Sequence, residues 1–349
     1  MAVIDKFAYS SKDFLLSSVC DDHKNCNKTK LEVMLCDGWD EGMKQGYFRY
    51  ELNDVQSRLI PGERKYIVQF NNKRFVERRK PQMITHLREP FQPDKFNFTK
   101  VKNTEILFQL TPHHSNDSID INEEQTLMMI NVSPIEYGHV LLVPNIQQHL
   151  NQVLTEQAIK YGIELMLLTI SREFRVGFNS LCAHASVNHL HLHGWYVQWQ
   201  LPTETCKADR ICEDCFELRD SLVRGFAFEV MDLNNIDNLS RKIFQITEYF
   251  SDNEVAHNMY LTRGDSFSDS SVHGIVRILL WPRQSVFEMK EENLFNIAVA
   301  ELSGYLPIRD LDGFKNITEK EIDSAIEEAS LSKEQFDSIK TDIIKLIGH

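Results

Sequence analysis

The sequence has no long apolar run and little positive charge. No stretch approaches the roughly 20 consecutive apolar residues that a membrane-spanning helix needs. The first residues, MAVIDKFAYSSKDFLLSSVC, lack a basic segment followed by a long apolar run, so we expect no secretory signal there. A formal net charge of -13 argues against general binding to nucleic acid or to an anionic membrane. We therefore expect a soluble intracellular protein that attracts any anionic ligand through local positive charge.

Cysteines are few, and their number is odd. Seven in 349 residues fit reduced thiols better than a disulfide framework, which favours a cytoplasmic location. Two loose groups carry thiols or imidazoles that zinc can use: Cys206, Cys212 and Cys215, and Cys20, His23 and Cys26. Neither spacing matches a closed four-ligand zinc pattern, so we favour ordinary free cysteines and leave zinc binding open.

The most informative feature is a row of three histidines at alternate positions. His189, His191 and His193 occur in the run NHLHLHGWYV. Side chains of a strand alternate between its two faces, so this spacing predicts three imidazoles on one face and Leu190 and Leu192 on the other. Such a row of imidazoles either holds a metal ion or handles a phosphate.

The chain is long enough to bury a large core in one domain or two. Hydrophobic spacing predicts helices over 29–46, 154–173, Asp237–Phe250 and Lys320–Ile347. Residues 71–100 carry many charges and prolines, which is typical of a long surface segment. Strands are predicted over Tyr47–Leu52, Lys65–Phe70, Glu105–Leu110, Leu127–Asn131, His139–Val143, Phe174–Phe178, Ala185–Val197, Phe226–Met231, Ala256–Arg263 and Val276–Trp281.

Two motifs resemble the histidine-triad superfamily. They are NVSPIEYGHVLLVP at 131–144 and the later HLHLHG. The resemblance implies a nucleotide site in which His191 attacks the α-phosphorus, with His189 and His193 beside it and Asn131 near the ribose.

A closer resemblance extends over most of the chain. The stretches RRKPQ, FNFTK, ASVNHLHLHGWYV, RGFAFEV, HNMYLTRG, RILLWPR and ELSGYLPI are similar to the GDP-D-glucose phosphorylase family, relatives of plant GDP-L-galactose phosphorylase. That branch resembles galactose-1-phosphate uridylyltransferase. The resemblance implies an α+β fold of two histidine-triad-like halves, residues 1–200 and 201–349, with a mainly antiparallel sheet and outer helices in one compact unit. The plant relatives have Gln where this chain has His193.

The implied reaction converts GDP-glucose and phosphate to glucose 1-phosphate and GDP by a ping-pong route through a guanylyl-histidine on His191. The family chemistry requires no metal or other cofactor. A neutral imidazole, with a pKa near 6.5, is available as a nucleophile at pH 7. Its other ring nitrogen needs an acceptor, for which the neighbouring strand is a candidate.

Several polar residues are candidates for binding the substrate. Arg78, Arg79 and Lys80 supply local positive charge for the diphosphate or the incoming phosphate, although a solvated surface also explains this run. His139 is expected behind the catalytic residues, and His113 and His114 are expected to do nothing specific. His257, Asn258 and Arg263 contact sugar or phosphate, or only form structural hydrogen bonds. The substrate-binding candidates are Asn131, Ser133, Asn188, Arg78, Arg79, Lys80 and Arg263.

Two other functions use the same histidines. A metal-dependent hydrolase or dioxygenase needs H-x-H on a strand, but no Asp or Glu occurs between Phe174 and Leu201 to complete a metal site. A non-catalytic nucleotide-binding protein needs the pocket without covalent chemistry. The preference for base and sugar rests on the resemblance, and a homodimer remains open.

Overall fold

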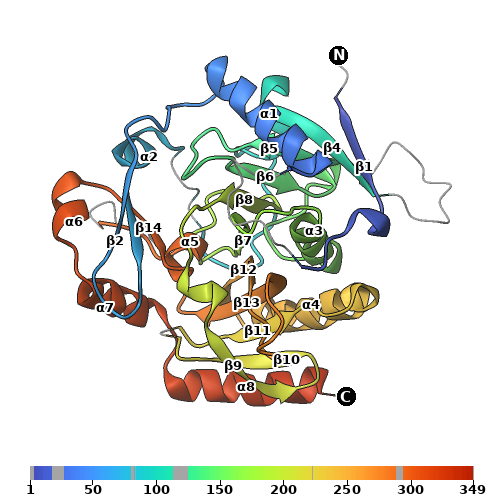
Figure 1. The fold of residues 1–349 in the computed structure, drawn as a ribbon, viewed down its shortest axis with the longest axis vertical. Coiled ribbons are helices and arrows are strands. Elements are labelled where there is room, and N and C mark those ends of the chain that lie inside the picture. Colours follow the sequence, from blue (N-terminus) through green and yellow to red (C-terminus); the bar gives the residue numbers. More distant parts are fainter. Residues whose placement is uncertain are drawn as a thin grey trace.

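One 11-stranded sheet runs through the computed structural model, which describes residues 4–17, 27–79, 82, 84–112, 125–221, 223–287 and 294–348 (Figure 1). Neighbouring strands are antiparallel except for the parallel pair β1 and β4. In spatial order the strands are β1 (Lys6–Tyr9), β4 (Ile106–Pro112), β5 (Thr126–Ile130), β6 (Val140–Val143), β8 (Leu192–Tyr196), β7 (Phe174–Asn179), β12 (Ala256–Gly264), β13 (Ile275–Arg283), β11 (Phe226–Glu229), β10 (Cys215–Arg219) and β9 (Lys207–Cys212).

The sheet contains the same strand order twice. The first half runs β4-β5-β6-β8-β7 and the second runs β9-β10-β11-β13-β12, in mirrored positions about the β7–β12 pair. Along the chain, each half has one long helix before its last two strands. The helix α3 (Glu156–Leu167) lies between β6 and β7, and α4 (Ile236–Asp252) lies between β11 and β12. The expected α+β fold with a mainly antiparallel sheet is therefore present. The division at residue 200 stays a prediction, since the sheet is continuous between β7 and β12.

Four long helices cover one face of this sheet. They are α1 (Lys30–Lys44), α3, α4 and α8 (Lys333–Ile347), and their apolar residues share a single core with the sheet. Leu190 and Leu192 belong to this core, so the leucines between the histidines face the helices as predicted. The helix α1 begins at Lys30 because Thr29 and Glu32 form a reciprocal capping box. Figure 1 shows α8 lying alongside β9 and β10.

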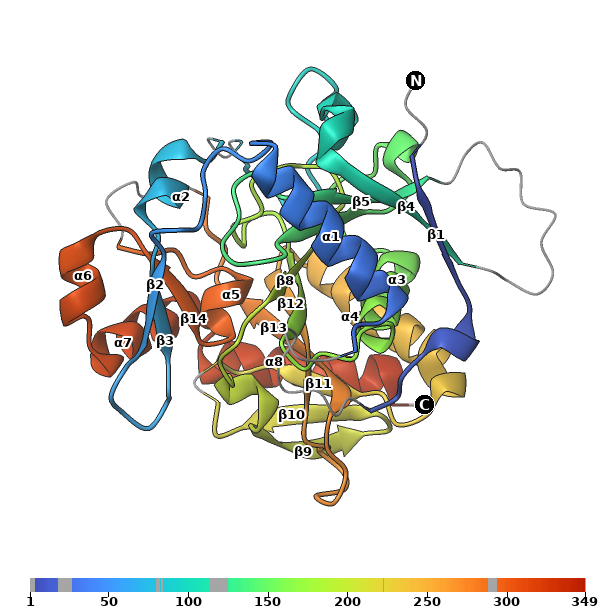
Figure 2. The same cartoon turned by 45° about the horizontal axis from the view of Figure 1, so that its top comes forward.

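The opposite face of the sheet is covered in two places. Segment 84–105 covers the first half, where it includes the short helices Phe98–Lys100 and Asn103–Glu105. The second place is covered by a small three-stranded sheet and the helices around it, and Figure 2 shows α5 beside these strands. Its elements are β14 (Tyr305–Ile308), β3 (Ile67–Phe70), β2 (Gln56–Leu59), α2 (Asn72–Glu77), α5 (Val299–Leu302), α6 (Leu311–Asn316) and α7 (Glu319–Ala329).

Most of the predicted strands and helices are confirmed, and three assignments are wrong. Tyr47–Leu52 forms bends, because Gly46 ends α1 with a positive φ and the chain then turns back so that Arg49 N–H donates to Val132 O. Residues 320–347 are mostly helical, as predicted, and form two helices, α7 and α8, because Ser330–Ser332 leaves the helical conformation and Ser332 caps α8.

The other two errors concern the site. Segment 71–100 is not only surface, since Ile84, Leu87 and Phe98 are buried despite the neighbouring charges. The expected strand over Ala185–Val197 forms ladder pairs only from Leu192, so His189 and His191 lie before it in irregular chain. That irregular conformation lets neighbouring histidines take different roles.

Candidate active site

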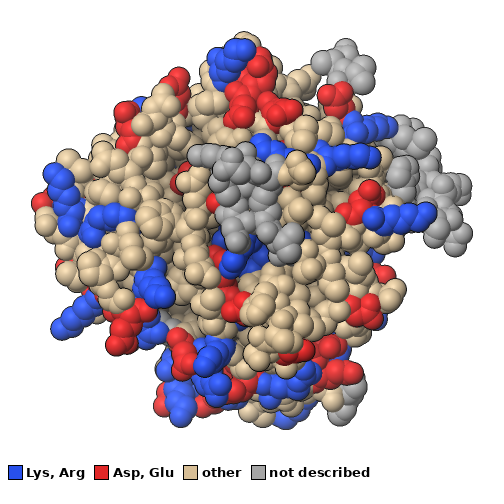
Figure 3. All heavy atoms as spheres, viewed as in Figure 1, with Lys and Arg blue, Asp and Glu red and all other residues tan. Residues whose placement is uncertain are grey.

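A cavity lies beside β8, on the sheet face opposite α3. It encloses about 1320 Å³ of empty space, including solvent at its mouth. His191, His193 and Trp195 line it, whereas Leu192 between them packs against Gly162 of α3. Figure 3 shows Lys or Arg atoms beside Asp or Glu atoms in the hollow near the centre of the molecular face in view. Its lining combines apolar side chains with converging polar and charged groups, which is typical of ligand-binding cavities.

His191 has one ring nitrogen committed to the backbone and one at the cavity. Its Nδ1 lies 2.8 Å from the carbonyl oxygen of His189. A carbonyl only accepts hydrogen bonds, so Nδ1 carries the proton and the lone pair lies on Nε2. The acceptor thus comes from the same segment, not from the neighbouring strand as expected. Burial lowers the pKa of His191 to about 4, so the ring is neutral at pH 7.

The buried amide of Gln152 fixes the backbone of His191. The His191 N–H donates to Gln152 Oε1 at 2.9 Å, and Gln152 Nε2 donates to the carbonyl oxygens of His191 and Asn179 at 3.1 and 3.0 Å. Gln152 therefore replaces the ladder hydrogen bonds that this stretch lacks. Because both ends of the amide are bound, the imidazole is held in one position before any ligand arrives.

A chain of three hydrogen-bonding groups sets the tautomer of His193. The Ile135 N–H donates to His139 Nδ1 at 3.0 Å, so the proton of His139 lies on Nε2. His139 Nε2 lies 3.0 Å from His193 Nδ1, which accepts its proton, and 3.2 Å from Asn131 Nδ2, a donor from which the protonated nitrogen cannot accept. His193 therefore carries its proton on Nε2. Burial lowers the pKa of His139 and of His193 well below the usual range, so both rings are neutral donors or acceptors.

The structure does not place His189 in the cavity wall. Its Nδ1 accepts a hydrogen bond of 3.1 Å from the Phe98 N–H, and its ring lies among those of Phe91, Phe98 and His149. Burial lowers its pKa to about 4. His189 thus attaches segment 84–105 to the histidine segment and supplies the carbonyl that orients His191.

Of the three amide and hydroxyl candidates, two lie at the cavity and one does not. Asn131 and Ser133 line it, and Asn131 Oδ1 accepts from the Ser133 N–H at 3.0 Å. Asn188 instead donates to the carbonyls of Glu89 and Pro90 and accepts from the Gln152 N–H at 2.9 Å. Its role is to hold the chain around the site, so the expectation of a substrate contact at Asn188 is not supported by its position.

Basic side chains gather at the cavity near α2. Arg78 and Arg79 line it together with Arg74 and Arg49, while Lys80 lies outside the described residues. Burial first, and then the charge of Arg74, lowers the pKa of Arg78 to about 10. Arg79 stacks over the ring of Phe96, and its Nη1 is buried without a described hydrogen-bond partner. Desolvated positive charge of this kind favours an anionic ligand.

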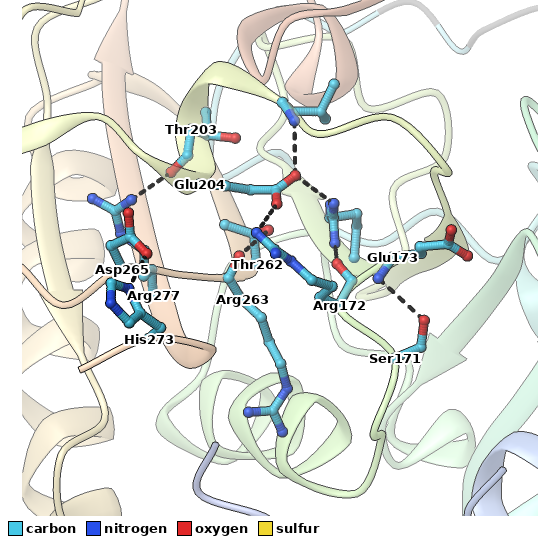
Figure 4. Close-up of polar contacts among 12 residues, drawn as sticks. Ser171, Arg172, Glu173, Thr203, Glu204, Thr262, Arg263, Asp265, His273 and Arg277 are labelled. Atoms are coloured by element: carbon cyan, nitrogen blue, oxygen red, sulfur yellow. Dashed lines mark hydrogen bonds and ion pairs between the residues drawn. The ribbon is translucent and has the colours of Figure 1, made fainter. Parts of the chain in front are cut away.

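Arg263 forms structural hydrogen bonds, so its position does not support the expectation of a substrate contact. It is fully buried, and its guanidinium donates to the carbonyls of Leu15, Leu16, Met166, Thr169 and Gly274. Figure 4 shows the side chain directed away from Glu204 toward a helix. The guanidinium thereby joins the N-terminal segment, the end of α3 and the residue that precedes β13.

The other two second-half candidates also lie away from the cavity. Asn258 donates to Asn179 Oδ1 at 2.6 Å and to the carbonyl of Ala183. His257 donates from Nδ1 to the carbonyl of Val255 at 3.1 Å and is buried among aromatic rings. Both positions therefore agree with the alternative that these residues form only structural hydrogen bonds. His113 and His114 lie outside the described residues.

Sequence reasoning missed three polar residues at the end of the cavity over β7 and α5. Glu301 is buried, and burial raises its pKa to about 7. His184 Nδ1 and Asn296 Oδ1 are buried without a described partner. All three line the cavity. No spacing in the sequence marks them, because they come from the β7–β8 loop and from a segment more than a hundred residues later. Only the capping box of Glu301 with Ala298 is visible locally.

The structure describes three of the cysteines that the sequence offers as zinc ligands. Cys206 lies beside Thr203 and Arg277, while Cys212 and Cys215 face each other in the β9–β10 hairpin. Cys20, His23 and Cys26 lie outside the described residues. Across the described ranges, no group of three His, Cys, Asp or Glu side chains is arranged to hold a metal ion, and no helix could span a membrane.

Two family models match the chain, and named relatives align with most of it. The GDPGP1-like N-terminal domain matches residues 30–195 and the GDPGP1-like C-terminal domain matches residues 200–349. GDP-D-glucose phosphorylase 1 of Danio rerio is 38% identical over 98% of both chains. That of Homo sapiens is 37% identical over 92% of this chain and 85% of its own. GDP-L-galactose phosphorylase 2 of Arabidopsis thaliana is 29% identical over 92% and 77%.

A solved structure shares the fold at low identity. Yeast Ap4A phosphorylase Apa2 in complex with Ap4A gives a TM-score of 0.59 at 15% identity and covers 87% of this chain and 98% of its own. The likeness concerns the fold alone. It agrees with the expected architecture of a large, mainly antiparallel sheet with outer helices.

Proposed function

Because the chain belongs to the GDPGP1-like family, we propose that it is a nucleotidyltransferase that converts GDP-D-glucose and phosphate to glucose 1-phosphate and GDP. Relatives named GDP-D-glucose phosphorylase 1 align with nearly its full length. The single observation that carries the mechanism is the tautomer of His191, which presents a lone pair on Nε2 at the cavity wall.

In the first step, His191 Nε2 attacks the α-phosphorus. A nitrogen–phosphorus bond forms, the bond from the α-phosphorus to the bridging oxygen breaks, and the electron pair leaves on glucose 1-phosphate. The hydrogen bond from Nδ1 to the His189 carbonyl stabilises the positive charge that develops on the ring. The leaving phosphate has a second pKa of about 6, so it needs little help from an acid.

In the second step, an oxygen of inorganic phosphate attacks the same phosphorus, the nitrogen–phosphorus bond breaks and GDP leaves. We assign His193 Nε2–H as a donor to an equatorial oxygen of the reacting phosphoryl group, because His139 fixes that tautomer. Arg78 is our candidate for holding the incoming phosphate, which lies where glucose 1-phosphate lay.

The polar end of the cavity suits the glucose. Asn296, His184 and Glu301 offer buried polar atoms that a hexose can satisfy with its hydroxyls. We further propose a cytosolic location, since the described cysteines are free thiols, which suit a reducing compartment.

A phosphorolysis panel of nucleotide sugars tests this proposal. We expect GDP-glucose to be the best substrate of the wild-type protein and His191→Asn to lose turnover by several powers of ten. Intact mass measured after adding GDP-glucose without phosphate should show one added GMP on the wild-type protein and none on His191→Asn. Added phosphate should remove the GMP as GDP.

Each rival function gives a different result in the same panel. A metal-dependent hydrolase would lose activity with a chelator and release GMP without any phosphate requirement. A non-catalytic nucleotide-binding protein would bind GDP-glucose equally well with and without the His191 side chain, and would release no product. Turnover by the wild-type protein with no mass shift would refute the covalent route.

A further inference from the structure

The cavity has an apolar end that the chemistry of the phosphates leaves unexplained. One line of residues crosses the sheet on the cavity side through backbone pairing, from His193 on β8 to Leu141 on β6, Met129 on β5 and Ile106 on β4. Adjacent strands are roughly 4.8 Å apart, so the line runs about 14 Å from the imidazoles. Glu105 immediately precedes Ile106 and lines the cavity at that far end.

Flat apolar walls enclose this end of the cavity. The walls belong to the core cluster that joins segment 84–105 to β5 and β6. The ring of Phe98 lies 4.9 Å from the ring of His191, so the apolar end begins directly beside the nucleophile. Such walls suit a planar aromatic base. The lining residues are Phe96, Phe98, Val101, Met129, Leu141 and Val187.

Two charged groups stand at the end of these walls. Glu105 is half-buried; its Oε1 accepts only a long 3.3 Å hydrogen bond from the Lys102 N–H, and within the described residues it forms no ion pair. Arg79, whose Nη1 is buried without a described partner, feels the charge of Glu105. The carboxylate therefore has free lone pairs where the far edge of a base would lie.

We infer that Glu105 reads the Watson–Crick edge of guanine and so sets the base preference of the site. This inference rests on the proposed function. Guanine presents two parallel donors, N1–H and the 2-amino group, which match the two oxygens of one carboxylate. Adenine presents an acceptor at N1, which the carboxylate repels, and hypoxanthine presents N1–H alone. Arg79 supplies the complementary donor for the O6 carbonyl of guanine.

Substitution Glu105→Gln tests the inference. Glutamine has the same shape and can still accept from the Lys102 N–H, so the fold is kept. We would measure kcat/KM for GDP-glucose, inosine diphosphate glucose and ADP-glucose. We expect the wild-type protein to prefer GDP-glucose over the inosine analogue by about 10-fold or more, because one charge-assisted hydrogen bond is lost. In Glu105→Gln the ratio of kcat/KM for GDP-glucose to kcat/KM for inosine diphosphate glucose should fall to about two.

A structural defect lowers kcat/KM for both nucleotide sugars in the same proportion, whereas a loss of base recognition changes the ratio between them. Asp94→Asn, an exposed substitution on the same segment, is the matched control and should keep the wild-type ratio. The inference is overturned if Glu105→Gln lowers both rates in the same proportion, or if the wild-type protein does not distinguish GDP-glucose from its inosine analogue. If the wild-type protein cleaves no nucleotide sugar, the proposed function fails. Equilibrium binding of GDP against IDP then still tests Glu105.

Discussion

The two halves of the sheet share a strand order, but among the described residues the imidazoles that line the cavity come from the first half. In the first half, His193 and Trp195 of β8 face the cavity. The strand in the corresponding position of the second half is β13, and its Leu279 and Trp281 are buried in an apolar core on that face. The shared order therefore provides a scaffold, and the side chains on one face decide whether it becomes a site.

Two histidines make this difference specific. His191 and His257 both direct Nδ1 at the carbonyl two residues earlier, at 2.8 and 3.1 Å, so they have the same tautomer. His191 lines the cavity, whereas His257 is buried on the helical side between Phe178 and Phe250. Burial lowers the pKa of both to about 4. A neutral imidazole with an oriented lone pair is thus insufficient for catalysis without access to a ligand.

Replacing each of these histidines by asparagine should give the largest contrast. We expect His191→Asn to lower kcat for GDP-glucose phosphorolysis by at least about 1000-fold, since it removes the nucleophile that we propose. His257→Asn should keep activity within about threefold and lower the free energy of unfolding by about 1–3 kcal/mol. Steady-state kinetics and urea unfolding measure the two effects. Equal losses of activity in both variants would contradict the assignment.

The second contrast is between an arginine at the cavity and a buried one. Arg78→Ala should raise KM for phosphate by about 10-fold or more with little change in Tm, because it removes an unpaired charge. Arg263→Ala should lower the free energy of unfolding by about 3 kcal/mol or more, because several buried carbonyls lose their donor. Arg78→Lys should recover part of the phosphate affinity. An unchanged phosphate KM in Arg78→Ala would move the phosphate site elsewhere.

The third contrast concerns His139, which acts through His193. His139→Ala should lower kcat by about 10-fold, because His193 loses the partner that fixes its tautomer. His139→Gln, which restores a donor near the position of Nε2, should recover part of that loss. In the second half, the exposed His273 bonds Asp265, and His273→Ala should leave kcat unchanged. If kcat of His139→Gln is as low as kcat of His139→Ala, then His139 is only a packing residue.

The smallest effect is the dependence of stability on pH. Burial lowers the pKa of His189, His191 and His257 to about 4, below the value near 6.5 in an unfolded chain. Between pH 6.5 and 4 the unfolded chain therefore binds more protons, so this contribution is complete above pH 6.5 and is lost toward pH 4. We expect Tm to fall over that range, and less steeply in His257→Asn. Parallel Tm curves for the two proteins would contradict neutral burial of His257.

Local pattern predicted much of the scaffold and only part of the site. Alternation placed Leu190 and Leu192 in the core, and paired strands at 256–263 and 276–281 are confirmed. The same alternation did not reveal that His189 turns from the cavity, because its ring accepts from a backbone N–H of segment 84–105. The surroundings of Arg263 were not predicted for a similar reason, since its five carbonyl partners come from three distant segments.

The sequence by itself determined the family, the burial of Leu190 and Leu192 and the periodicity that buries the sheet, because these depend on residue order within short stretches of chain. Only the tertiary structure decided which imidazoles, arginines and acids line the cavity. Those choices depend on hydrogen bonds and burial between segments far apart in the chain, such as Phe98 with His189, or on a shared cavity, such as that of Glu301 and His193. No spacing within a single segment encodes such contacts.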